Sequence, residues 1–130
     1  KAMLPATLNA SVVVQEKYSL PIYGAKDGIE SLNFRDWVWV QRENDKILDP
    51  YKLLPPVFND IDFNTEDLIS TNPKLRGGGD AMIAYARTQY EEMGGKERDL
   101  IFQALKKYCE LDTFAMVMVY EGWVDLIRQA

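Results

Sequence analysis

Two residues near the end of the chain, Tyr108 and Asp112, are the strongest candidates for a functional pair. They lie four residues apart in KKYCELDTFAMVMVYEGW, residues 106–123, which has the pattern of a helix. Four residues make about one helical turn, so a hydroxyl and a carboxylate at this spacing can point into one cleft. The face is otherwise apolar, and a buried carboxylate needs a partner or a metal ion. The alternative is that Asp112 lies at the rim and that Glu110 and Thr113 share the solvent with it.

The composition excludes several classes of chemistry. The 130 residues contain no histidine, which removes Ser-His and Cys-His nucleophilic pairs, imidazole zinc sites and histidine acid–base catalysis. With 20 acidic and 15 basic residues, the net charge of −5 gives no broad attraction to a phosphate backbone. Nucleic-acid binding would therefore need a local basic patch.

The sequence predicts a soluble cytoplasmic protein that makes no use of a membrane. Cys109 is the single cysteine, so no internal disulfide can form, as is typical of a reducing compartment. A signal peptide is not evident. The longest uninterrupted apolar run, Phe114 to Tyr120, is far too short to span a bilayer.

The N-terminal part of the chain is expected to form short elements. A helix is predicted over residues 9–18, with Asn9 as its N-cap. The alternating β-formers DWVWV, a turn at RENDK and a return strand at Ile47–Leu48 predict a β-hairpin. Asp49 before Pro50 predicts a capped single turn of helix.

The C-terminal part is expected to be helical. A helix over residues 80–93 would be capped by Asp80 and ended by Gly94. The last segment, residues 96–130, repeats apolar residues at the i, i+3, i+4 spacing of one helical face. It should form the longest helix of the chain, with Gly122 as its one weak point.

The predicted fold class is therefore an α-rich α+β fold with short helices, one β-hairpin and a long C-terminal helix. Residues 1–130 are long enough for one domain with a real core, and 47% of them are hydrophobic. The chain begins with Lys1 in what reads as the middle of an element. We therefore expect a single domain that is a C-terminal fragment of a larger protein.

Two short motifs resemble ion-binding sites in part. For both, an ordinary connecting loop is the preferred interpretation. DIDFNTED, residues 60–67, begins like a calcium loop, but Thr65 stands where the loop needs glycine and Thr71 where it needs glutamate. RGGGDA, residues 76–81, could offer backbone N–H groups to an anion, but it lacks the Gly-Lys-Ser/Thr ending of a nucleotide loop.

The string YCELDTFAMVMVYEGW resembles the third motif of the DnaQ-like three-prime-to-five-prime exonucleases of the subclass with tyrosine. In that motif a tyrosine is followed by three residues, an aspartate and an apolar helix, and Tyr108 and Asp112 match it. The segments LPATLNASVVVQEKYSLPIYG, SLNF, DPYKLLPPVF and GGGDAMIAYAR, together with KYCELDTFAMVMVYE, look like the C-terminal region of an uncharacterised bacterial family. In that family a domain of unknown function follows a nuclease-like region. This second resemblance covers almost the whole chain.

The exonuclease resemblance implies the C-terminal part of a ribonuclease-H-like fold and a site with two divalent ions, Mg²⁺ or Mn²⁺. In that superfamily four carboxylates hold the ions that activate water and stabilise the leaving oxygen. Asp112 would be the last of these ligands, and Tyr108 would orient the attacking water. The other acids are not found here, because the sequence has no strand carrying an Asp-x-Glu pair. The full-length protein would be a two-metal exonuclease, and this fragment alone would be inactive and without bound metal.

The partners that follow are the upstream part of the same chain and nucleic acid. Apolar surface left uncovered in a fragment also predicts association with a second copy. One alternative is a non-catalytic structural or protein-interaction module that keeps only the exonuclease-like helix. Another is a nucleic-acid-binding accessory that stacks bases on Trp37 and Trp39 beside the pair Lys106–Lys107.

Overall fold

The structure is a computed structural model that describes residues 2–54, 78–90, 92 and 94–130. The chain divides into two compact units. Unit 1 consists of Lys1–Leu54 and Lys107–Ala130, and unit 2 of Pro55–Lys106. Tyr108 and Asp112 both belong to unit 1, so the candidate site can be described within that unit. The predicted single domain stays a prediction.

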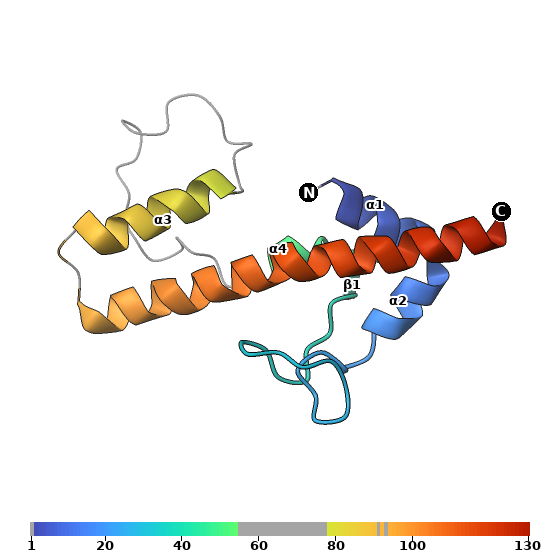
Figure 1. The fold of residues 1–130 in the computed structure, drawn as a ribbon, viewed down its shortest axis with the longest axis horizontal. Coiled ribbons are helices and arrows are strands. Elements are labelled where there is room, and N and C mark those ends of the chain that lie inside the picture. Colours follow the sequence, from blue (N-terminus) through green and yellow to red (C-terminus); the bar gives the residue numbers. More distant parts are fainter. Residues whose placement is uncertain (1, 55–77, 91, 93) are drawn as a thin grey trace. The chain divides into compact units, whose positions relative to one another are not determined.

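The described chain is mostly helical, with one small hairpin and a long C-terminal helix (Figure 1), which confirms the predicted α-rich class. In chain order the elements are α1 (Met3–Ala10), α2 (Val12–Tyr18), β1 (Arg42–Glu43), β2 (Lys46–Ile47), the 3-10 helix η1 (Pro50–Leu53), α3 (Gly78–Tyr90) and α4 (Gly95–Gln129). α4, with 35 residues, is the longest of these elements, as predicted.

The single helix predicted over residues 9–18 is in fact two helices that meet at Ser11. Ser11 has extended backbone angles, and its hydroxyl accepts a hydrogen bond from the backbone N–H of Val14 at 3.3 Å. Asn9 is not the cap, because it lies in the last turn of α1 and its amide donates to the carbonyl of Pro5. The Ser11 hydroxyl also donates to Asp125 of α4 at 2.6 Å. A hydroxyl can serve both roles, and this tertiary partner favours the break at Ser11.

The hairpin is confirmed, but its first strand is shorter and lies further along the chain than predicted, and its second strand begins one residue earlier, at Lys46. β1 and β2 pair antiparallel, and the turn between them consists of Asn44 and Asp45. Both turn residues have positive φ, 49° and 63°. Asn and Asp tolerate this region better than other non-glycine residues, which explains a two-residue turn here.

Trp37 and Trp39 lie outside the two strands, so the predicted strand through them is wrong. Trp39 is fully buried, and its ring centroid lies 5.2 Å from that of Tyr23 and 5.0 Å from that of Phe34. Trp37 is half-buried and makes an isolated bridge to Tyr23. Aromatic packing rather than a strand ladder positions both residues. A base cannot stack on a buried Trp39, so the paired platform is also wrong.

The C-terminal half of α4 supplies one wall of the core of unit 1. Its buried residues include Leu111, Ala115 and Met118, which belong to the same cluster as residues of α1 and α2. Gly122 continues this face within an unbroken helix. A Cβ atom at Gly122 would lie 2.2 Å from the Thr7 methyl carbon, so the glycine permits α1 to approach closely. The predicted weak point is therefore a packing position.

The remaining predictions concern the middle of the chain. α3 begins at Gly78, two residues before the predicted cap Asp80, and ends at Tyr90. The calcium-like motif at residues 60–67 lies outside the described residues, as do Arg76 and Gly77 of the glycine run. None of the helices in the described part of the chain has the length and apolar character needed to cross a membrane.

Candidate functional site

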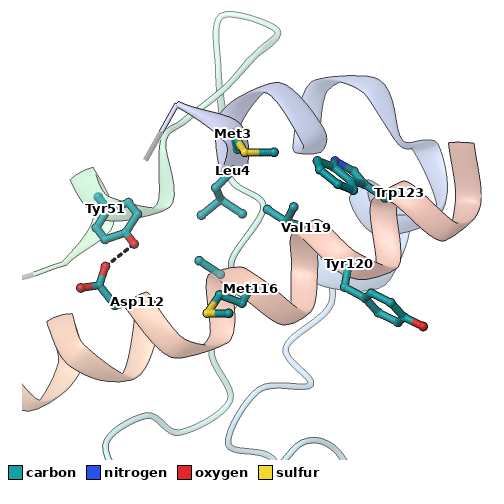
Figure 2. A pocket seen from close by; sticks show the side chains of 9 residues that line it. Met3, Leu4, Tyr51, Asp112, Met116, Val119, Tyr120 and Trp123 are labelled. Atoms are coloured by element: carbon teal, nitrogen blue, oxygen red, sulfur yellow. Dashed lines mark hydrogen bonds between the residues drawn. The ribbon is translucent and has the colours of Figure 1, made fainter.

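Tyr108 and Asp112 lie one turn apart on α4, and a third residue, Tyr51, joins them. Asp112 is exposed and Tyr108 is half-buried. The Tyr51 hydroxyl donates a hydrogen bond of 2.5 Å to Oδ1 of Asp112 (Figure 2). The Tyr51 ring also packs on the Tyr108 ring, with 5.7 Å between the centroids. The predicted pair is therefore part of a trio that includes a residue from η1.

Local sequence explains why Tyr51 projects from this point. The Asp49 carboxylate accepts a hydrogen bond from the backbone N–H of Tyr51 at 3.1 Å, so Asp49 caps η1 as predicted. Pro50, which is buried, has a fixed φ suited to the first helical position. The sequence therefore predicts the turn. It does not predict the contact, because Tyr51 and Asp112 are 61 residues apart and no spacing rule links them.

The Tyr51 phenol remains protonated well above neutral pH. Burial raises its pKa most, and the hydrogen bond to Asp112 and the negative charge of that carboxylate raise it further. Tyr51 therefore keeps the proton with which it bonds Asp112 at physiological pH. This bond holds the carboxylate in one orientation. Among the described residues, its second oxygen, Oδ2, accepts no hydrogen bond.

Beside Asp112 lies a groove with a cavity of about 470 Å³. Tyr51 and Asp112 lie at one end of it, as Figure 2 shows. Its apolar walls come from Met3 and Leu4 of α1 and from Met116, Val119 and Trp123 of α4. We call this feature the groove. Of the described residues that line it, Asp112 alone carries a charge.

The exposed face of α4 in unit 1 is apolar over several turns. Its large exposed side chains recur at intervals of four, three and four residues, which places them on one helical face. They are Met116, Tyr120, Trp123 and Ile127, called here the α4 stripe. Figure 2 shows the Tyr120 ring turned away from α1. The predicted association of an uncovered apolar surface with a second copy stays a prediction.

Glu110, which the alternative interpretation of the sequence placed in solvent with Asp112, instead binds the loop that follows α2. Its carboxylate accepts hydrogen bonds from the Tyr23 hydroxyl at 2.7 Å, from the Asn33 amide at 2.6 Å and from the Ser31 hydroxyl. Burial by itself would raise the pKa of Glu110. The hydrogen bonds from Ser31, Tyr23 and Asn33 outweigh burial and leave the pKa below its usual value.

We expect Glu110 to make folding sensitive to acid. Its pKa is lower in the folded state, so its contribution to stability is present above the unfolded pKa and is lost as pH falls through the folded value. Glu110→Gln should cost about 1 kcal/mol of unfolding free energy at neutral pH. It should also flatten the loss of stability below pH 4.5, the ordinary glutamate pKa. Urea unfolding at a series of pH values measures both effects.

The matched control is Glu30→Gln, which makes the same charge change at an exposed position of the same loop. It should leave the pH dependence of unfolding unchanged. An equal flattening in both variants would show that the loop responds to overall charge and not to the bonds of Glu110.

Tyrosine–carboxylate hydrogen bonds recur where the N-terminal segment meets α4. Three of them join residues more than 60 positions apart in the sequence: Tyr18–Glu121 at 2.8 Å, Tyr23–Glu110 at 2.7 Å and Tyr51–Asp112 at 2.5 Å. The carboxylates of α4 therefore hold the preceding chain in place. For Asp112, this structural role is compatible with a second role, because the residue is also exposed.

The described residues do not form a complete metal site. Within the part of the chain that the structure describes, acidic and cysteine side chains do not gather in groups of three or more that could hold a metal ion. A two-metal site needs several carboxylates around the ions. Asp112 could supply one ligand at most.

Comparisons with known protein families, with curated proteins and with solved structures found no significant match. A proposal for the function must therefore be argued from the residues of α4 and η1. Of the predicted site residues, both Tyr108 and Asp112 lie against Tyr51. Tyr51 is the site residue that the sequence did not indicate.

Proposed function

We propose that this chain is the C-terminal part of a metal-dependent, exonuclease-like protein that hydrolyses phosphodiester bonds. Unit 1 would form the C-terminal end of a ribonuclease-H-like fold, with Asp112 as one metal ligand and Tyr108 as the residue that orients water. Other parts of the full-length protein complete the site, and the chain by itself is inactive. The proposal rests on the resemblance of Tyr108-x₃-Asp112 to the third exonuclease motif.

One structural observation supports this role: the Asp112 carboxylate is exposed and yet held in one orientation. Tyr51 binds Oδ1, which leaves Oδ2 available to a ligand on the exposed side of α4. Carboxylates that bind metal ions are commonly oriented in this way by a hydrogen bond from a neighbouring side chain. The same Tyr51 ring supports Tyr108 by ring packing. One residue of η1 thus positions both members of the motif.

The chemistry divides between the metal ion and the chain. A divalent ion, Mg²⁺ or Mn²⁺, would lower the pKa of water and stabilise charge on the phosphate. Tyr51 holds the carboxylate of Asp112 by donating a hydrogen bond to Oδ1. Tyr108, half-buried beside Tyr51, presents a phenol one turn before Asp112 on α4. Nucleic acid would be the substrate in this proposal.

The test is a graded series of variants in the full-length protein. We expect Asp112→Asn to reduce Mn²⁺-dependent hydrolysis of a labelled single-stranded oligonucleotide by roughly 100-fold or more, because it removes a metal ligand. Tyr51→Phe should lower Mn²⁺ affinity by roughly 10–100-fold, the usual effect of losing a residue that orients a ligand. Isothermal titration with Mn²⁺ gives the affinity, and fluorescence gives the rate.

Asp99→Asn is the matched control, because it makes the same charge change at an exposed position of α4 in unit 2. Its activity should equal that of the wild type. Full activity in Asp112→Asn would reject the proposal. So would a folded full-length protein that neither binds Mn²⁺ nor cleaves the oligonucleotide.

A folded full-length protein without Mn²⁺ binding or cleavage would favour a non-catalytic structural or protein-interaction module. The observation behind this candidate is the α4 stripe, whose Met116, Tyr120 and Ile127 side chains are largely exposed. Exposed apolar patches of this kind often contact another protein. In that case the carboxylates of α4 serve only to hold residues 11–51 against the helix.

A further inference from the structure

The groove has the lining of a small-molecule site rather than of a metal site. Its volume of about 470 Å³ falls within the range of pockets that bind small ligands. Leu4, Val119 and the thioethers of Met3 and Met116 give it apolar walls. Hard metal ions prefer several oxygen ligands, whereas these walls offer carbon and sulfur.

The charged group of the groove lies at one end. There the Asp112 carboxylate and the Tyr51 hydroxyl are already bonded to each other (Figure 2). The hydroxyl donates a hydrogen bond to Oδ1 and carries no charge itself, so this end of the groove presents the negative charge of Asp112 to an incoming ligand. With Asp112 as the one charged side chain among the described lining residues, a cation is attracted and an anion repelled.

The other features of the walls also suit a cation with an organic body. The Tyr51 and Trp123 rings flank the groove, and an aromatic face attracts an alkylated ammonium group. Methionine side chains are flexible and polarisable, so they adapt to apolar groups of different shape. The half-exposed Trp123 and the exposed Met116 leave the groove accessible from solvent.

We propose that the groove is a binding site for a small organic cation, with the apolar body between α1 and α4 and the positive charge beside Asp112. Charge complementarity at Asp112 selects the head of the ligand, and the apolar walls select its tail. The proposal rests on the groove lining and not on metal-dependent hydrolysis, so it can succeed where the nuclease proposal fails.

The experiment uses three probes with one tail and different heads: hexyltrimethylammonium, 1-hexanol and hexanoate. Each is titrated into the 130-residue chain, and binding is followed by the NMR shift of the Trp123 indole N–H, assigned with Trp123→Phe. We expect the cation to bind at least about tenfold more tightly than the alcohol and the anion to bind most weakly. The quaternary head keeps its charge at every pH.

Two variants test the position of the site. Asp112→Asn should remove the preference for the cation and leave the affinity for 1-hexanol unchanged. Met116→Lys places a resident cation one turn from Asp112 and should weaken hexyltrimethylammonium binding at least about tenfold. Met116 is 73% exposed, so this variant should fold.

Val117→Lys is the matched control for Met116→Lys, because it adds the same charge at the next exposed position, outside the groove. It should bind the cation like the wild type. Equal affinities for the three probes would overturn the proposal. So would an unchanged cation affinity in Asp112→Asn, or an equal loss of binding in both lysine variants.

Discussion

Met118→Ala should lower the free energy of unfolding by roughly 2–5 kcal/mol. Met118 has no exposed surface and lies in the core of unit 1 with Leu111 and Ala115. Truncation removes apolar contacts within this core cluster, which also includes residues of α1 and α2, and leaves a cavity that the surroundings fill only in part. Urea unfolding followed by circular dichroism should show a lower midpoint at nearly constant slope.

Met116→Ala is a close control, because it makes the same change on the same helix two residues earlier. Met116 is 73% exposed, whereas Met118 is 0% exposed. The control should change stability by no more than about 0.5 kcal/mol. Helix propensity changes equally in both, so the difference isolates burial. Similar losses in both variants would mean that α4 does not pack on the core by the face described.

Gly122→Ala should produce a net loss of roughly 1–2 kcal/mol, although alanine normally stabilises a helix interior relative to glycine by up to about 1 kcal/mol. The added Cβ would lie 2.2 Å from the methyl carbon of Thr7. Thr7 is buried and β-branched, so its side chain has few other rotamers available. α1 must therefore move away from α4. Thermal and urea unfolding measure the loss.

A second substitution makes this prediction specific. Thr7→Ser removes the methyl group and keeps the hydroxyl, so Gly122→Ala should be much less harmful in the Thr7→Ser background. Gly95→Ala is the control, because a Cβ there meets nothing within 4 Å. A stabilised Gly122→Ala variant, or two changes that are simply additive, would contradict the described contact.

Elements with a local signal could be predicted from the sequence. The apolar repeat predicts α4, Asp49 before Pro50 predicts the start of η1, and the polar turn predicts a hairpin. Each signal lies within a few residues of the structure it specifies. The exact strands were wrong, because Trp37 and Trp39 are placed by aromatic packing with Tyr23 and Phe34.

The candidate site could be predicted only in part, because sequence patterns reveal local contacts and not distant ones. Tyr108 and Asp112 are neighbours on one helix, so their spacing reveals them. Tyr51 meets Asp112 across 61 residues, and Ser11 meets Asp125 across 114. Contacts at such separations depend on how the elements pack, which no local pattern encodes. The alternative interpretation, with Glu110 in solvent, could not foresee that its three partners lie in a distant loop.

The composition of unit 1 from the two ends of the chain has a consequence for biosynthesis. Lys1–Leu54 leaves the ribosome before its core partners Leu111, Ala115 and Met118, which lie more than 50 residues later in the sequence. Until α4 is synthesised, the aromatic side chains of Lys1–Leu54 therefore stay exposed to solvent, and a chain in this state is prone to aggregation. Closing the intervening residues into a loop adds an entropic cost, and contacts so distant in sequence slow folding. A nascent chain that stops before α4 is complete would be a natural client for chaperones.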